Sequence, residues 1–356
     1  MNPSKTEKIL VNFSGKSIYI NKRYSNLKDA YYTGISESYT AYDNISDREV
    51  KILAIENALD WNGRIKGTLN EINLMKHFQH ENILQLYDID FYEHNDSLTL
   101  YLITESMDTS LDAVIRSSQD LTDLHIKFII YQILRALVYI HSAGVILGNL
   151  SPKVVGINAN CDVKITDFWF AFANNENYWY EDHIYDVDRL FLAPECLNIA
   201  RFITTKSDIW SVGCIMAYFL KRQNPLFNPE NSLKQINSMF ELLGFPAEDD
   251  LLFINNEEAL SSLFKTSAKP DKTPFKVIFP EADSLAIDFL EKMLVFNPLK
   301  RWDAEKLLKH EYLKDFYEPK NDNTTAMVFE FDYHDRWTKT KVLKEKLNRI
   351  IGRDAS

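Results

Sequence analysis

The stretch that decides the fold is residues 141–169, which read HSAGVILGNLSPKVVGINANCDVKITDFW. It is largely apolar, and few of its side chains are suited to chemistry. Asn149 can orient a hydroxyl by hydrogen bonding, but an amide does not accept a proton at neutral pH. Asp167 offers carboxylate oxygens, the hard ligands that Mg²⁺ prefers. These two polar groups stand among residues that favour packing: Leu147, Val154 and Trp169.

The composition is that of an ordinary globular protein. The chain has 356 residues, of which 46% are hydrophobic and 26% charged, enough for one large domain or two lobes. A formal net charge of −11 argues against binding to nucleic acid or to an anionic membrane, which need concentrated Lys and Arg. Basic partners are therefore the easier expectation.

Targeting signals and metal-binding cysteine patterns are not evident in the sequence. No window reaches the roughly 18 apolar residues of a membrane span, so we expect an intracellular protein. The three cysteines, Cys161, Cys196 and Cys214, are scattered, without a CxxC spacing or a neighbouring His. They indicate buried thiols rather than a zinc site or a disulfide framework.

Hydrophobic periodicity divides the chain into a strand-rich part and a helical part. Alternating β-branched and aromatic residues predict strands near 16–20, 48–55 and 98–104, and a three-residue spacing predicts a helix over 65–78. Farther along, the pattern predicts a buried helix that begins after Thr122, a second buried helix over 207–220, an extended segment at 327–331 and a helix over 338–351.

Three motifs, one inside the opening stretch and two after it, have the order and spacing of a eukaryotic protein kinase: Asp167-Phe168, Ala193-Pro194-Glu195 and Asp208-Ile209-Trp210-Ser211-Val212-Gly213-Cys214. Residues 77–83, 131–143 and 296–301 further resemble the mitogen-activated protein kinases. The resemblance covers about residues 17–351. Thr104, at the position of a small hinge gatekeeper, and Met107 favour the stress-activated branch of that family.

The resemblance implies an α+β, bilobal protein kinase fold. We expect an N-terminal extension at 1–16, a small antiparallel β lobe at 17–107, and a larger α-helical lobe at 108–319 that includes the family insert near 247–280. A C-terminal extension at 320–356 should pack back on the small lobe.

The nucleotide site implied by the resemblance departs from the family at several positions. Only Gly34 remains of the glycine-rich loop, and Leu53 stands where the family has its phosphate-binding lysine, so Glu71 loses its usual partner. Lys51 shares a strand face with Leu53. It should point into the cleft, where it either obstructs adenine or reaches across to Glu71.

The catalytic positions have changed as well. Leu147-Gly148-Asn149 aligns with the family's His-Arg-Asp, so Asn149 replaces the catalytic base, and Val154 replaces the second metal ligand. Asp167 remains as a candidate metal ligand or as a group that only hydrogen-bonds the loop backbone. Trp169 replaces a glycine and should favour one fixed arrangement, with its ring plugging the cleft. Leu147 should pack under Phe168.

In the activation segment, the family's Thr-X-Tyr pair becomes His183-Ile184-Tyr185, which leaves only Tyr185 for regulation. Gly148 replaces the arginine that would clasp a phosphothreonine, so switching by dual phosphorylation is not expected. Asp186 and Asp188 add acidity where a substrate-positioning surface would be. The aromatic run at 178–180 is either a partner-binding patch or a loop packed on its own lobe.

Architectural positions are retained. Glu195 should pair with Arg301, and Asp208 should accept backbone hydrogen bonds from the catalytic loop. Of the acidic groove that the family uses to dock basic peptides, Glu318 and Asp322 remain, which indicates weaker or altered docking, or an ordinary solvated charge run.

Two functions compete. The first is a MAP-kinase-like pseudokinase, a non-catalytic binding or scaffolding component of intracellular signalling that requires no ATP or Mg²⁺. The second is an atypical, weakly active Ser/Thr kinase that uses Lys51, Asn149 and Asp167. Five departures favour the first, because groups that act as a unit fail together. They are the glycine-rich loop, Leu53, Asn149, Val154 and Trp169. We expect signalling proteins as partners, no nucleic acid or membrane, a monomer or hetero-complex, and a cytoplasmic or nuclear location.

Overall fold

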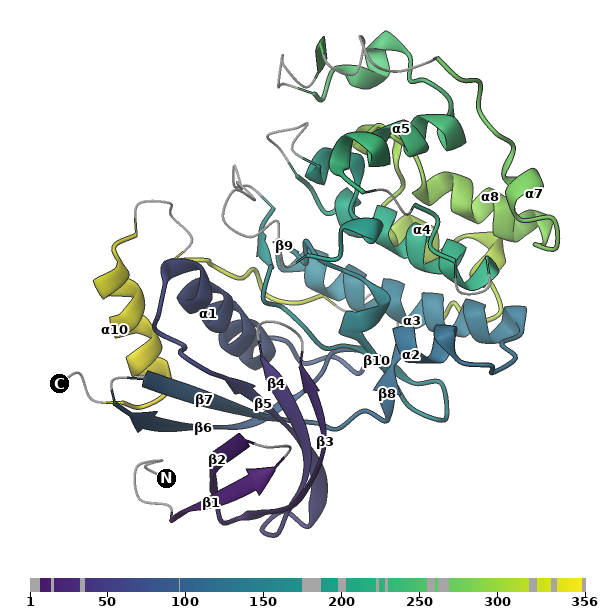
Figure 1. The fold of residues 1–356 in the computed structure, drawn as a ribbon. Coiled ribbons are helices and arrows are strands. Elements are labelled where there is room, and N and C mark those ends of the chain that lie inside the picture. Colours follow the sequence, from purple (N-terminus) through teal and green to yellow (C-terminus); the bar gives the residue numbers. More distant parts are fainter. Residues whose placement is uncertain are drawn as a thin grey trace.

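The computed structural model describes residues 7–13, 16–32, 36–95, 97–174, 187–197, 203–221, 224–227, 230–254, 260–261, 269–319, 325–333 and 338–353. These residues form two lobes, a smaller one built mainly of strands and a larger one built mainly of helices (Figure 1). The α+β, bilobal architecture expected from the sequence is confirmed.

The centre of the small lobe is a five-stranded antiparallel sheet with the order β3-β4-β5-β7-β6. Its strands are β3 (Tyr24–Tyr32), β4 (Glu37–Asp43), β5 (Arg48–Ile55), β6 (Leu86–His94) and β7 (Ser97–Thr104). Strands β5 and β7 confirm two of the predicted strands. We did not predict β3, β4 or β6, and in β3 two register shifts break the two-residue alternation on which the prediction depends.

Each face of this sheet has its own cover. The hairpin of β1 (Lys8–Phe13) and β2 (Lys16–Asn21) lies on one face, where Ile18 and Ile20 pack with Val50 and Ile52. Helix α1 (Asn62–His77) lies on the other face (Figure 1). Because side chains alternate along β5, Lys51 and Leu53 point toward the α1 side.

The large lobe follows β8 (Thr109–Ser110). In the part of this lobe that the structure describes, the helices include α2 (Leu111–Arg116), α3 (Asp123–Ser142), α4 (Lys206–Leu220), α5 (Ser232–Leu243), α7 (Phe275–Ile278), α8 (Ser284–Met293) and α9 (Ala304–Leu308). Short strands lie between α3 and α4: β9 (Val145–Ile146), β10 (Val155–Ile157), β11 (Val163–Ile165) and β12 (Phe172–Ala173). Within the described residues, 3₁₀ turns of this lobe lie at Pro152–Val154, Arg189–Phe191, Pro194–Cys196, Glu248–Leu251, Pro298–Lys300 and Glu311–Leu313.

Helix α3 is the central helix of this lobe and begins after its N-cap residue Thr122, as predicted. By length and composition it is apolar enough to cross a membrane, although the sequence had led us to expect no such segment. Its apolar residues, among them Ile129, Leu134 and Leu137, are buried against the rest of the lobe. A core helix meets the same criterion, and we interpret α3 as one.

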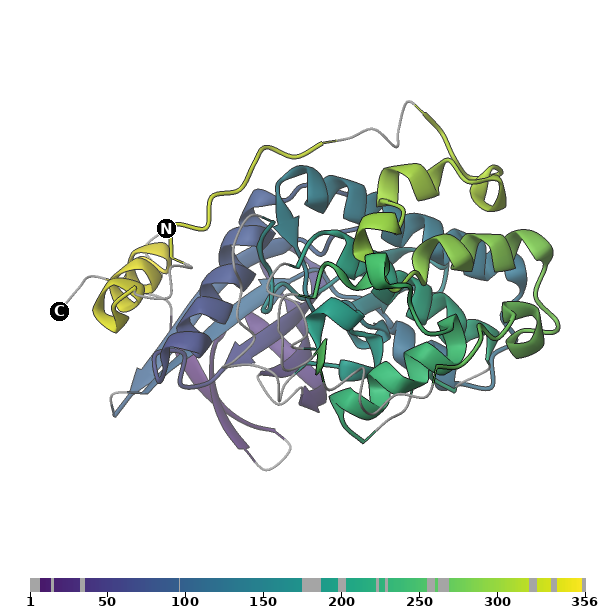
Figure 2. The ribbon, with the colours of Figure 1, turned by 90° about the horizontal axis from the view of Figure 1, so that it is seen from above.

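The C-terminal extension runs from the large lobe to the small one (Figure 2). Residues 325–333 are extended, and helix α10 (Thr340–Ile350) follows. Leu343 and Leu347 of α10 are fully buried, and the helix packs against α1. The extension therefore packs, through α10, on the helix that covers the small-lobe sheet.

Candidate functional site

The loop that carries Asn149 is held by one buried carboxylate from α4. Asp208 accepts the backbone N–H groups of Leu147 (3.0 Å) and Gly148 (3.1 Å), and its Oδ2 lies 2.9 Å from Nε2 of His141. Gly148 has a φ of +75°, a backbone conformation that glycine adopts without steric cost. The loop is thereby fixed between β9 and β10.

The side-chain amide oxygen of Asn149 accepts a hydrogen bond from this chain's own backbone. Its Oδ1 accepts the backbone N–H of Asp188 at 2.9 Å. The carboxylate of Asp188 lies 3.0 Å from Nζ of Lys153 and is only 14% exposed. For Asp188, the expectation of added acidity at a substrate-positioning surface is therefore wrong, because this side chain is largely buried and its charge is paired. Asp186 lies outside the described residues.

Two carboxylates near α1 are also bonded to backbone. Asp167 Oδ1 accepts the N–H of Trp169 at 2.9 Å, and Glu71 Oε2 accepts the N–H of Phe168 at 2.8 Å. Burial, followed by the charge of Asp167, raises the pKa of Glu71 well above its ordinary value. Loss of solvation also raises the pKa of Asp167. Both groups therefore favour the neutral form more than an exposed carboxyl does.

The indole of Trp169 is packed against α1. Trp169 is 8% exposed, and a Cβ added to Gly67 would lie 2.2 Å from the Cε2 atom of the indole, so only glycine fits at position 67 without displacing the ring. Asn70, one turn farther along α1, donates from Nδ2 to the carbonyls of Trp169 (3.0 Å) and Ala171 (2.8 Å). The Trp169 ring and the two hydrogen bonds from Asn70 thus place the segment after Asp167 on α1.

The remaining nucleotide-site positions lie on β5, β7 and the segment that follows. Leu53 pairs with Leu102 across the sheet and packs against the main core. Thr104 is buried and donates its hydroxyl to the carbonyl of Glu105 at 3.1 Å. Met107 packs closely on Gly156: a Cβ added to Gly156 would lie 2.7 Å from the Cγ atom of Met107. Gly34 lies outside the described residues.

The residues at the family's metal positions fit Mg²⁺ poorly. Val154 has no oxygen to offer and packs against the core, and Asp167 already accepts a backbone N–H through Oδ1. Among the described residues, no group of three or more His, Cys, Asp or Glu side chains is placed to hold a metal ion.

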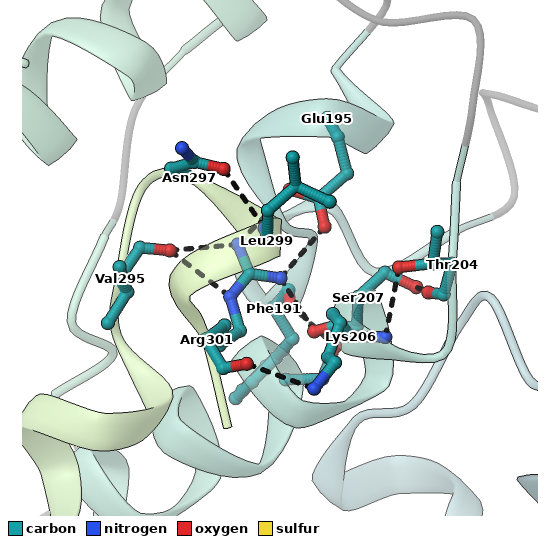
Figure 3. A network of polar contacts seen from close by, with 10 residues as sticks. Phe191, Glu195, Thr204, Lys206, Ser207, Val295, Asn297, Leu299 and Arg301 are labelled. Atoms are coloured by element: carbon teal, nitrogen blue, oxygen red, sulfur yellow. Dashed lines mark hydrogen bonds and ion pairs between the residues drawn. The ribbon is translucent and has the colours of Figure 1, made fainter. Parts of the chain in front are cut away.

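The architectural pair forms a buried network in the large lobe (Figure 3). Arg301 Nη1 and Nη2 lie 2.8 and 3.2 Å from the two carboxylate oxygens of Glu195, and neither side chain is exposed. The same guanidinium donates to the carbonyls of Val295 and Lys206. The contact joins the turn at Pro194–Cys196 to the segment before α9.

The regulatory and docking positions are less completely described. Tyr185 and Asp322 lie outside the described residues, as do residues 178–180 and parts of the insert at 255–259 and 262–268. Glu318 is described, and its side chain is exposed.

Sequence reasoning missed three residues that organise this site: Gly67, Asn70 and Tyr333. The hydroxyl of Tyr333 donates to Asn70 Oδ1 at 3.1 Å, and both residues are buried. One signal was available, because aromatic residues alternate at 329, 331 and 333 and thus predict a segment with one buried face. Gly67 and Asn70 looked like weak helix formers in an otherwise regular helix.

Comparisons with known proteins agree with the motifs. The family model described as protein kinase domain matches residues 34–313. Mitogen-activated protein kinase 13 of Arabidopsis thaliana is 38% identical over 306 residues, which cover 86% of this chain and 83% of the relative. The mitogen-activated protein kinase homolog NTF6 of Nicotiana tabacum is 38% identical over 309 residues, covering 86% and 81%. Mitogen-activated protein kinase 5 of Oryza sativa subsp. indica is 37% identical over 307 residues, covering 85% and 81%. This chain belongs to the mitogen-activated protein kinase family.

Proposed function

We propose that this member of the family is a pseudokinase, a non-catalytic binding or scaffolding component of intracellular signalling. One observation carries the proposal: three polar side chains at the family's catalytic positions are hydrogen-bonded to this chain's own backbone. Asn149 accepts from Asp188, Asp167 from Trp169 and Glu71 from Phe168. Groups committed in this way support the loops instead of a bound substrate.

The chemistry of phosphoryl transfer explains why these hydrogen bonds to the backbone bear on catalysis. Transfer depends on positioning and on charge placed around the phosphates, and the protein supplies little covalent chemistry. Here Leu53 and Val154 bring no charge or oxygen, and Asn149 brings no base. Catalytic groups act as a unit, so the remaining carboxylates have little left to act upon.

The same reasoning extends to ligands and partners. We propose that the protein requires no ATP or Mg²⁺ and acts in the cytoplasm or nucleus. It would bind signalling proteins, including proteins with basic docking peptides, as a monomer or in a hetero-complex. The net charge of −11 supports basic partners, because complementary charge accelerates encounter.

A thermal-shift titration with ATP, with and without Mg²⁺, tests the proposal. We expect the melting temperature of the wild type to stay constant, because ligand binding would raise it. Asp162→Ala, which changes an aspartate on the nearby β10–β11 turn, serves as the matched control for Asp167→Ala. A magnesium-dependent stabilisation that is lost in Asp167→Ala and retained in Asp162→Ala would overturn the proposal.

One observation favours the alternative, a weakly active Ser/Thr kinase of this family. The alternation along β5 places Lys51 on the same face as Leu53, toward α1. If Lys51 takes over the role of the missing lysine, the protein will transfer phosphate from ATP to a generic substrate, and Lys51→Ala will abolish the transfer. Detection of that pattern would establish the alternative and refute the pseudokinase proposal.

A further inference from the structure

The C-terminal extension reaches the site from outside the two lobes. Residues 325–333 lie along the ends of α3 and α1 (Figure 2). Two hydrogen bonds from their backbone attach them to the end of α3: the N–H of Ala326 donates to the side-chain oxygen Oγ of Ser142 at 2.8 Å, and the N–H of Phe329 donates to the carbonyl of Ala143 at 2.9 Å. His77, at the end of α1, lies 2.8 Å through Nε2 from the carbonyl oxygen of Met327.

The extension presents one aromatic face to the protein. The rings of Phe329 and Phe331 are 4.8 Å apart, those of Phe331 and Tyr333 are 6.1 Å apart, and His77 lies 5.2 Å from Phe329. The intervening residues Glu330 and Asp332 are exposed, as is Val328 just before Phe329. This alternation is that of an edge segment that docks through every second residue.

The last aromatic residue of this face makes the decisive contact. Tyr333 donates its hydroxyl to Asn70 Oδ1, while the amide nitrogen of Asn70 donates to the carbonyls of Trp169 and Ala171. A single buried amide is thus bonded to the extension through its oxygen and to the segment after Asp167 through its nitrogen. Because the amide is planar, a hydrogen bond at its oxygen also orients its nitrogen.

We infer that the C-terminal extension acts as a strap that sets the position of the segment after Asp167, with Asn70 as the link between the two. The steric contact of Trp169 with Gly67 gives the segment one arrangement on α1, and the strap stabilises that arrangement through the amide. By thermodynamic reciprocity, whatever lifts the strap loosens the segment, and whatever displaces the segment loosens the strap. This inference goes beyond the proposed function and holds whether or not the site is catalytic.

Native-state hydrogen exchange, followed by mass spectrometry, tests the first direction. Tyr333→Phe removes only the hydroxyl that bonds to Asn70. The amides of Phe168, Trp169 and Ala171 in residues 168–173 are hydrogen-bonded. We expect their hydrogen exchange to accelerate about fivefold, because losing one ordinary hydrogen bond changes the opening equilibrium by about that factor.

Tyr312→Phe is the matched control. It removes a tyrosine hydroxyl that donates to Asp123 Oδ1 at 2.8 Å within the large lobe. It should leave exchange in residues 168–173 unchanged. Equal acceleration in both variants would show a general loss of stability, and no acceleration in Tyr333→Phe would show that the hydroxyl does not act on the segment; either result would overturn the inference.

The reverse direction needs a change that does not touch the strap. Gly67→Ala places a Cβ 2.2–2.5 Å from three ring atoms of Trp169 and must displace the indole. We expect faster exchange in residues 325–333, including the Phe329 amide that is bonded to Ala143. Gly213→Ala, which crowds Leu294 at 2.8 Å within the large lobe, is the control and should not affect the strap. A strap equally protected in wild type and Gly67→Ala would refute the coupling.

Discussion

The Glu195–Arg301 pair allows a prediction of stability that can be worked from the structure. Glu195→Gln keeps the size of the side chain but removes its charge and turns an NH₂ group toward one of the guanidinium nitrogens, which are also donors. The guanidinium remains fully buried, where an uncompensated charge is costly. We expect the free energy of unfolding to fall by about 3–5 kcal/mol, the usual consequence of removing one partner of a buried pair.

Urea denaturation followed by circular dichroism measures this change as a shift of the unfolding midpoint. Glu305→Gln provides the matched control, because Glu305 and Lys309 form a pair at 2.7 Å whose side chains are 60% and 48% exposed. Its midpoint should stay close to that of the wild type, since water screens an exposed pair. Similar midpoints for Glu195→Gln and the wild type would refute the view that burial makes this pair essential.

Three further predictions concern the site and the extension. The pKa of Glu71 is raised above its ordinary value of 4.5, so its contribution to stability is present below that pH and is lost as pH rises through the folded-state pKa. Glu71→Gln, which can still accept from Phe168, should therefore reduce the fall in the urea midpoint between about pH 5 and about pH 8; an unchanged fall would contradict this. Asn149→Asp should give no phosphate transfer from radiolabelled ATP, because one restored group does not restore the unit; measurable transfer would contradict the pseudokinase proposal. Leu347→Ala, at a fully buried position of α10, should lower the unfolding free energy by about 2–5 kcal/mol. Val342→Ala, at a position 39% exposed, is its control in the same urea assay, and equal shifts would refute the packing role of α10.

Much of the fold follows from periodicity in the sequence. The three-residue spacing of Leu69, Ile72 and Met75 correctly gave α1, and the narrow polar strip of residues 126–140 correctly gave α3. Periodicity failed for β3, whose bulges interrupt the alternation. The helix predicted over 338–351 is α10, which spans Thr340–Ile350.

The sequence predicts which side chains occupy the site, but it does not predict which partners they bond to. The sequence alone shows that Asn149 and Val154 lack the chemistry of the residues they replace. It does not show that Asn149 bonds to Asp188, because that contact joins residues 39 positions apart and depends on how the loops meet. Asn70 lies 99 and 101 positions before the residues whose carbonyls it binds, and no local pattern encodes such a pairing.

Gly67 and Trp169 also affect which sequences can be reached from this one. The missing side chain of Gly67 is the space that the indole fills, so each residue restricts what the other can become. Replacing Trp169 by glycine alone removes a large buried ring, at a cost of about 3–5 kcal/mol. Enlarging Gly67 alone forces the ring out of its place, at a cost of about 1–3 kcal/mol. A sequence with glycine at position 169 and a larger residue at position 67 is therefore reached only through a destabilised intermediate, whichever residue changes first.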